Sequence, residues 1–170
     1  EIPDGGEEKA ATTEDALSRK GGIPIDEAHF PDSNFRRYLV ISSFDKNKDG
    51  ILSEQEIKKV DTIDCYAWEI KSFKGIEYFT EIKTLRCGSK VLTSLDVSQN
   101  KKLKDLRCRG NALTSLDVSQ NKKLCSLSCD DNRSESLAGA GNICHMDTDK
   151  SSDRIISCVG NRLEKLDLRG

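Results

Sequence analysis

The clearest signal in the chain is a pattern of apolar and polar positions that recurs every 21 residues. Residues 95–103 (LDVSQNKKL) recur unchanged as residues 116–124. The same offset relates the Leu-x-Cys triplets at 85–87, 106–108 and 127–129. A repeat of this length is typical of a chain wound into stacked coils, in which each coil covers the apolar side of the next.

The repeat predicts two short strands in each coil. Side chains two residues apart point to the same side of a strand, so the Leu and Cys of Leu-x-Cys face inward together. The Leu-Asp-Val triplet has the same alternation and predicts a second strand. Coils stacked at the strand spacing of about 4.8 Å would form parallel sheets around one core. The asparagines at the turns are expected to bond backbone groups of a neighbouring coil.

The repeat is irregular at both ends. A degenerate coil begins with Ile63-Asp64-Cys65, and its larger Trp68 and Phe73 suit an end that seals against another element. A partial unit runs from 156 to 168. The spacing from Leu127 to Ile156 exceeds the period and predicts an insertion at 133–155, looped out or forming a short helix around 135–140.

The seven cysteines divide into two groups. Five share one inward-facing template position: Cys65, Cys87, Cys108, Cys129 and Cys158. A free cysteine packs as a small apolar residue, so we expect reduced, buried thiols there. Metal ligands must converge on a point, which a linear array does not do. Cys125 and Cys144 lie outside this column, and we hypothesise that a disulfide between them pins the insertion to the solenoid.

Residues 45–56 (DKNKDGILSEQE) match a calcium-binding EF-hand loop at every constrained position. Gly50 permits the sharp turn that this loop needs. The sequence therefore predicts one calcium site, and the alternative is a cap that keeps the loop shape without metal. A second acidic stretch at 147–153 lacks the glycine and the closing glutamate, so we expect a solvated loop there. The predicted calcium ligands are Asp45, Asn47, Asp49, the Ile51 carbonyl, Ser53 through water, and Glu56.

Helices are predicted on both sides of the calcium loop. The first starts near Pro31-Asp32-Ser33 and continues over 34–44. The second opens at Ser53, where Ser-x-x-Glu has the capping-box form. We therefore divide the chain into a polar, disordered leader or tether at 1–22, an EF-hand-like helix-loop-helix cap at 23–61 and the repeat solenoid at 62–170.

Charge, hydropathy and motifs argue against nucleic-acid binding, membrane insertion and catalysis. Lys and Arg total 27 against 29 Asp and Glu, and the net charge of -2 gives no general attraction for nucleic acid. No apolar stretch approaches the roughly 18 residues that a membrane helix needs. Neither histidine, His29 nor His145, lies in a catalytic motif, so we predict a binding protein and not an enzyme.

The stacked repeat brings charged residues into columns. Arg86, Arg107 and Arg109 are expected to form a basic strip on one sheet, which is our candidate ligand-binding surface. Asp96, Asp117 and Asp167 are expected to form an acidic column on the other strand. The alternative interpretation of both is an ordinary solvated face.

Several segments together resemble a known family. These are residues 30–36 (FPDSNFR), the loop at 45–56, residues 74–80 (KGIEYFT) and the Leu-x-Cys and Leu-Asp-Val-Ser-x-Asn repeats. In this order they are similar to the leucine-rich-repeat surface and secreted proteins of gut Gram-positive bacteria, which carry an EF-hand-like segment before the repeats. The resemblance covers residues 23–170.

The resemblance implies an α+β chain, with an EF-hand-like cap followed by a short leucine-rich-repeat solenoid of parallel strands in coils of about 21 residues. It also implies export to the cell surface or the medium, in keeping with a chain that begins at Glu1 without a methionine. The expected role is adhesion, through a protein or glycan ligand. The alternative is a calcium-stiffened spacer, or a unit whose open last coil pairs with a second copy.

Overall fold

The computed structural model describes residues 21–88, 90–133, 136–138, 155–159, 161 and 165–167. Several predictions lie outside these residues: the leader, Cys144 and its disulfide, His145, the acidic stretch at 147–153 and most of the open last coil. Within the described part, no helix is both long enough and apolar enough to span a bilayer.

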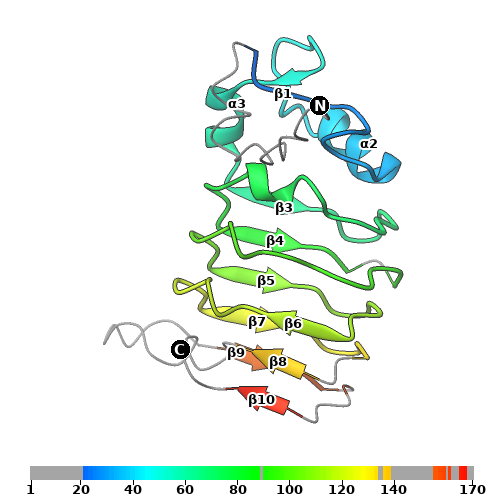
Figure 1. The fold of residues 1–170 in the computed structure, drawn as a ribbon, viewed down its shortest axis with the longest axis vertical. Helices are drawn as coiled ribbons and strands as arrows, with labels where there is room; N and C mark the ends of the chain where they lie inside the picture. Colours follow the sequence, from blue (N-terminus) through cyan, green and yellow to red (C-terminus); the bar gives the residue numbers. More distant parts are fainter. Residues whose placement is uncertain are drawn as a thin grey trace, which may run out of the picture.

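The chain forms a solenoid below a small cap, with its strands stacked one above another (Figure 1). Five strands pair in parallel as the long sheet, in the order β3-β4-β5-β7-β9. Three more pair in parallel as the short sheet, in the order β10-β8-β6. The long sheet consists of β3 (Thr62–Asp64), β4 (Thr84–Arg86), β5 (Asp105–Arg107), β7 (Ser126–Ser128) and β9 (Ile155–Ser157). The short sheet consists of β6 (Ser115–Asp117), β8 (Ser136–Ala138) and β10 (Lys165–Asp167).

The predicted Leu-x-Cys strands are confirmed, because their leucines pair in register across the long sheet. Leu85 lies opposite Leu106, and Leu106 lies opposite Leu127. The second strand is present at β6 and β10 but absent at 95–97. There the neighbouring coil on the cap side carries a 3₁₀ helix, η1 (Ile76–Tyr78), and offers no strand to pair with.

Strand β8 corrects the expectation of a short helix around 135–140. Leu137 pairs with Leu116 of β6, one repeat earlier, and its side chain is buried. The repeat therefore continues through Ala138, inside the predicted insertion at 133–155. The sequence alone did not predict this strand, because Leu137 is a single apolar residue among polar and small ones. The strand that it pairs with belongs to the preceding coil.

The cap holds two helices, α2 (Ser33–Ile41) and α3 (Glu54–Lys59). Asp32 caps α2 by accepting the Phe35 N–H. The predicted capping box of Ser53 and Glu56 opens α3. Helix α2 ends before the predicted residue 44, since Ser43 adopts a left-handed φ of 57°. A short antiparallel pair, β1 (Ile23–Pro24) and β2 (Ile51–Leu52), completes the cap.

Aromatic packing seals the cap onto the first coil, as the large residues there predict. The rings of Phe35 in α2 and Phe73 in the first coil lie 5.0 Å apart. Polar contacts fix the same junction. The Tyr38 hydroxyl accepts the Asp64 N–H at 2.9 Å, and Asp32 Oδ2 accepts the Lys71 N–H at 2.8 Å. Cap and solenoid therefore share one core.

Four of the five cysteines in the predicted column are buried as expected, and Cys158 is half-buried. All five are free thiols. Burial raises the pKa of the Cys87 and Cys108 thiols, and raises that of Cys129 to about 12. These buried thiols are thus neutral and serve as apolar packing.

Two ladders of buried asparagines bond the turns to the preceding coil. Asn121 Nδ2 donates to the carbonyls of Val97 and Asn100, at 2.9 and 3.0 Å. Asn111 Nδ2 donates to the carbonyls of Cys87 and Cys108, both at 2.9 Å. This confirms the predicted role of the turn asparagines, because a leucine at these positions could not supply an N–H group.

Replacing one ladder asparagine with leucine should destabilise the fold. Asn121→Leu removes two buried hydrogen bonds, and at about 1 kcal/mol each we expect a loss of about 2 kcal/mol in the free energy of unfolding. Urea unfolding followed by circular dichroism measures it. Gln120→Leu, at an exposed neighbour, is the control and should change stability by less than about 0.5 kcal/mol. Equal effects of the two substitutions would contradict the ladder.

The buried thiols predict a loss of stability at high pH. Their folded-state pKa lies above the ordinary value of 9.0, so the stabilisation is present below that pH and is lost as the pH rises above it. Each such thiol contributes a slope of up to about 1.4 kcal/mol per pH unit. Urea unfolding above and below that pH measures the slope. Cys87→Ala removes one of these thiols, so it should reduce the slope by up to about 1.4 kcal/mol per pH unit. An unchanged slope would contradict a raised pKa for the Cys87 thiol in the folded state.

Candidate functional site

The outer face of the long sheet is built by the residues that alternate with the buried Leu and Cys. The position between Leu and Cys forms a central column on this face: Asp64, Arg86, Arg107, Ser128 and Ser157. The position after Cys continues as an outer column: Tyr66, Gly88, Arg109, Asp130 and Val159. Because the strands are parallel and in register, each column runs along the solenoid.

Arg86 and Arg107, two of the predicted strip residues, are direct neighbours on β4 and β5. Arg86 Nη1 lies 3.2 Å from Asp64 Oδ2, and Arg107 Nε lies 3.1 Å from Asp105 Oδ2. Their side chains remain 41% and 51% exposed. Exposed ion pairs stabilise a fold little, so these carboxylates orient the guanidinium groups without using all their donors.

Arg109, the third strip residue, lies in the outer column and is exposed. It forms no ion pair within the described part of the chain. Its neighbour Asp130 is partly buried, which raises its pKa, but hydrogen bonds from the Ser157 hydroxyl and the Val159 N–H outweigh this and lower it. Asp130 thus accepts its hydrogen bonds from the next coil, and the N–H groups of Arg109 can bind solvent or a ligand.

A hollow of about 470 Å³ lies beside the outer column, where Gly88 has no side chain. A Cβ at Gly88 would lie 2.7 Å from the Tyr66 ring and 2.9 Å from the Arg109 carbonyl oxygen. Tyr66 therefore packs its ring on the glycine, and 62% of its surface stays exposed. The lining residues are Tyr66, Ala67, Glu69, Gly88, Lys90, Arg109, Gly110 and Asp131.

Sequence reasoning missed this hollow. It identified Arg109 but not Tyr66 or Gly88, because Tyr66 belongs to the degenerate first coil and stands outside the clear repeats. The available signal was the glycine at a template position that carries a side chain in the neighbouring coils.

The predicted acidic column is broken, because Ala138 of β8 lies between Asp117 and Asp167. Asp96 and Asp117 each accept the N–H of the serine two residues later, at 2.9 and 2.8 Å. Both aspartates therefore stabilise the turns that follow them, and this structural role explains why aspartate recurs at this position of the repeat.

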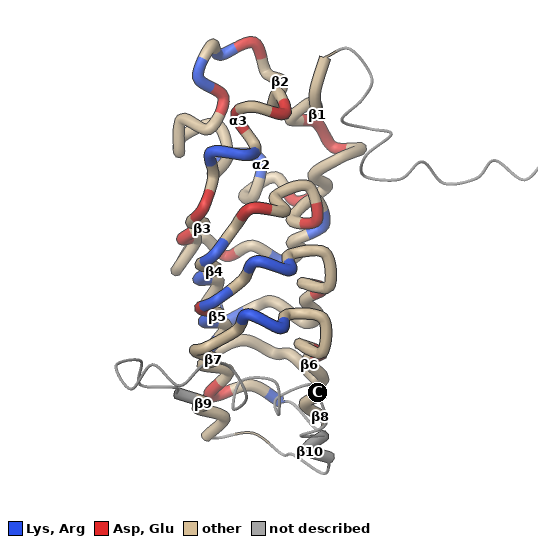
Figure 2. The backbone as a smooth tube through the Cα atoms, turned by 90° about the vertical axis from the view of Figure 1, so that its left-hand side faces the viewer, with Lys and Arg blue, Asp and Glu red and all other residues tan. Residues whose placement is uncertain are grey.

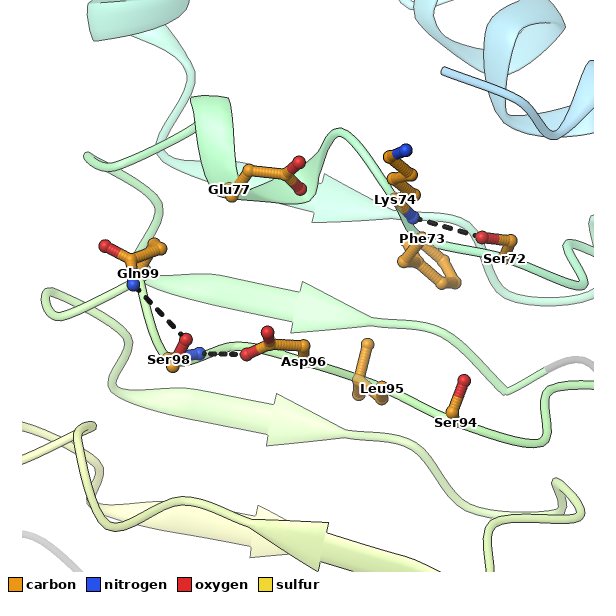
Figure 3. Close-up of a pocket in the computed structure, with 9 residues that line it drawn as sticks. All are labelled: Ser72, Phe73, Lys74, Glu77, Ser94, Leu95, Asp96, Ser98 and Gln99. Atoms are coloured by element: carbon orange, nitrogen blue, oxygen red, sulfur yellow. Dashed lines mark hydrogen bonds between the residues drawn. The ribbon is translucent and has the colours of Figure 1, made fainter. Parts of the chain in front are cut away.

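A shallow groove of about 320 Å³ lies beside Asp96, between the first coil and the next (Figure 3). The side chains around it are mostly polar, and several bond within their own turns. Gln99 Nε2 donates to Ser98 Oγ, and the Lys74 N–H donates to Ser72 Oγ. These local bonds leave the groove with few groups directed at a ligand.

The loop at 45–56 folds around its first and last predicted ligands. Asp45 Oδ2 accepts the Gly50 N–H at 2.8 Å, and Gly50 has the left-handed φ of 79° that the turn requires. Glu56 Oε1 accepts the Lys46 N–H at 2.6 Å. The Glu56 carboxylate therefore spans from the end of the loop to its beginning. Strand β1 braces the loop at Ile51 and Leu52.

The donor set of this loop suits a hard divalent cation by type and spacing. Asp45 and Glu56 are buried, and in the described part neither they nor Asp49 form an ion pair with Lys or Arg. A hydrogen bond from the Ser53 side chain is the main factor that lowers the pKa of Glu56, so this carboxylate is charged at neutral pH. As the side chains stand, no three His, Cys, Asp or Glu residues of the described ranges gather at one point. Calcium binding would therefore require the carboxylates to turn from their backbone partners.

Comparison with known proteins identifies the repeat. No protein-family model matches the chain. Over 71 residues, or 42% of this chain, it is 38% identical to Internalin J of Listeria monocytogenes serotype 4b (strain F2365). The functional domain of InlJ from Listeria monocytogenes, which includes a cysteine ladder, superposes with a TM-score of 0.63 at 29% identity over 87% of this chain. The fold of the described residues is thus a parallel-strand solenoid that matches the leucine-rich-repeat solenoid of internalins.

A second internalin, inlF of Listeria monocytogenes strain 4b F2365, has the same fold, with a TM-score of 0.63 at 20% identity over 75% of this chain. The chain spans only 8% of the length of Internalin J, and 34% and 37% of the two solved chains. The leucine-rich-repeat prediction is thus supported. The closer resemblance to proteins of gut Gram-positive bacteria stays a prediction.

Proposed function

We propose that this chain is an extracellular or cell-surface binding module that takes a protein ligand on the face of the long sheet. The observation that carries the proposal is the in-register pair of half-exposed arginines, Arg86 and Arg107, beside Arg109 and the hollow at Tyr66. Internalin-like relatives are surface proteins that bind protein ligands, which supports this assignment.

The chemistry of the face favours an acidic segment of the partner. A guanidinium group carries five N–H donors in a planar fork that matches a carboxylate. Arg86 and Arg107 each donate only some of these N–H groups to a neighbouring aspartate. Arginine and tyrosine are also the residues that most often dominate binding energy at protein interfaces. Tyr66 and Arg109 would then hold one partner side chain in the hollow between them.

Reversing the charge of the central column should weaken this binding. We expect Arg86→Glu/Arg107→Glu to raise the Kd for a protein ligand at least about tenfold, since a like-charge contact replaces an attraction. The ligand is first found by probing an array of purified extracellular protein domains with the wild-type chain, and the Kd is then measured by surface plasmon resonance.

The matched control is Arg37→Glu/Lys59→Glu, which makes the same charge change at exposed positions of the cap. It should change the Kd by less than about twofold. Ligands that bind the wild type and the Arg86→Glu/Arg107→Glu variant equally well would remove the long-sheet face as the binding surface.

We further propose that the loop at 45–56 binds one calcium ion, which would make the cap an EF-hand-like unit that stiffens the N-terminal end of the solenoid. Supporting it are the ligand spacing, the left-handed Gly50, and two buried carboxylates without a cationic partner in the described part of the chain. The role would be structural, because the loop is braced by β1 and its helix α2 is bonded to the first coil.

Calcium should therefore bind the full chain and raise its melting temperature. At a free concentration of one hundred times the Kd, the expected stabilisation is about 2.7 kcal/mol. Isothermal titration calorimetry and thermal unfolding measure the two effects. Glu56→Gln should lose both, whereas Glu54→Gln, two residues away on the exposed side of α3, should keep both. If calcium produces no heat and no stabilisation in the wild type, the loop is a metal-free cap.

A further inference from the structure

A second charged surface lies on the flank of the solenoid where the chain passes from the short-sheet side to the long sheet. Its residues occupy the two Asn-Lys-Lys-Leu turns, at 100–103 and 121–124, and the positions directly before β4 and β5, and all are exposed. We call this surface the lysine ridge: Lys83, Lys101, Lys102, Lys104, Lys122 and Lys123. In Figure 2, segments bearing Lys or Arg in successive coils lie one above another along the solenoid.

The backbone holds these lysines in rows. The Lys104 N–H donates to the Lys83 carbonyl at 2.8 Å, and the Cys125 N–H donates to the Lys104 carbonyl at 2.8 Å. Consecutive rows are therefore one strand spacing apart, about 4.8 Å. Lys101 and Lys122 occupy equivalent positions in neighbouring rows, as do Lys102 and Lys123.

The positive charge of the ridge is only partly balanced. Lys102 pairs with Glu81, and Lys83 lies 3.5 Å from Asp61. Lys101, Lys104 and Lys123 have no ion pair with any described residue. The whole chain has a net charge of -2, so this flank is a local excess of positive charge on a slightly acidic protein.

The fold does not need this excess. Within each row the buried Leu103 or Leu124 supplies the packing, and Asn100 or Asn121 supplies the internal hydrogen bonds. The lysine side chains are exposed and take no part in these buried contacts. Like charges directly opposite each other on neighbouring strands are unfavourable. An anionic partner would turn this unfavourable arrangement into a favourable one.

The shape and composition of the ridge restrict that partner. The lysines form a linear array along the solenoid, and ammonium groups act as point charges that tolerate varied geometry. No aromatic side chain lies in the rows 80–83, 101–104 and 122–125, so the ridge has no platform on which nucleobases would stack. These features fit an extended anionic chain without bases.

We propose that the lysine ridge is a binding site for a linear anionic glycan, a polysaccharide that carries sulfate or carboxylate groups along its length. The ridge lies outside the protein-binding face proposed above, and only the extracellular setting is shared between the two proposals. Binding is driven by release of counterions from the polymer, so it weakens steeply with salt.

Heparin is the probe for this site, with the full chain immobilised and the Kd measured over a series of salt concentrations. Lys101→Gln/Lys104→Gln/Lys123→Gln should raise the Kd at least about tenfold and lower the slope of log Kd against log salt by about 2, at about 0.7 per cation. The control Arg37→Gln/Lys59→Gln/Lys71→Gln removes the same charge from the exposed surface of the cap and first coil, and should stay within about twofold of the wild type.

Two further measurements separate loss of charge from loss of fold. The ridge variant should unfold at the same temperature as the wild type, and binding should be retained by Lys101→Arg/Lys104→Arg/Lys123→Arg. The proposal is overturned if the wild type does not bind heparin at low salt, or if ridge and control variants lose affinity equally. Tighter binding to a single-stranded oligodeoxythymidine, or to vesicles containing phosphatidylserine, would replace the glycan with that partner. The Arg86→Glu/Arg107→Glu variant tests the long-sheet face separately, so either proposal can fail alone.

Discussion

The structure depends on one constraint: a coil can satisfy its inner polar groups only by bonding to the coils beside it. The strands contain three residues each in the two parallel sheets, too few to form a stable unit alone. Their leucines and cysteines become buried only when the coils stack in register. The asparagine ladders extend the same dependence into the turns, where Asn121 bonds two carbonyls of the coil before it. Each coil therefore depends on its neighbours for burial and hydrogen bonds, and provides the same for them.

A stack of this kind exposes an apolar end unless something covers it, and the cap serves this purpose. Helix α2 places Phe35 and Tyr38 against the first coil, whose own large side chains replace the repeated leucines. The Tyr38 hydroxyl and the Asp32 carboxylate bond backbone N–H groups of that coil. The Tyr38 bond occupies a donor of β3 that would otherwise be left open at the end of the long sheet, and the Asp32 bond fixes the loop that follows β3. The irregular first coil is thus the part of the solenoid that has adapted to a helical neighbour.

Stacking in register also explains how a short chain can present distinct surfaces. A residue type that recurs at one template position becomes a column, and its charge is concentrated along a line. The arginines of the central column and the lysines of the flank arise in this way, on adjacent but separate sides. Departures from the repeat are equally informative. Gly88 lets the Tyr66 ring pack on the backbone beside the hollow, and Ala138 interrupts the aspartates of the short sheet.

The period, the Leu-x-Cys strands, the cysteine column, the capping box and the loop at 45–56 could all be predicted from the sequence, because each depends on residues close together in the chain or on an identical repeat. Strand β8, the missing strand at 95–97 and the hollow at Tyr66 could not. Whether Leu137 is in a strand depends on its pairing with β6, and residues 95–97 form no strand in a coil whose neighbour on the cap side carries η1 instead of a strand. Local sequence thus determined what each coil is made of. The tertiary structure decided which coils pair and which columns face solvent, because pairing and exposure are properties of neighbours that lie 21 or more residues apart.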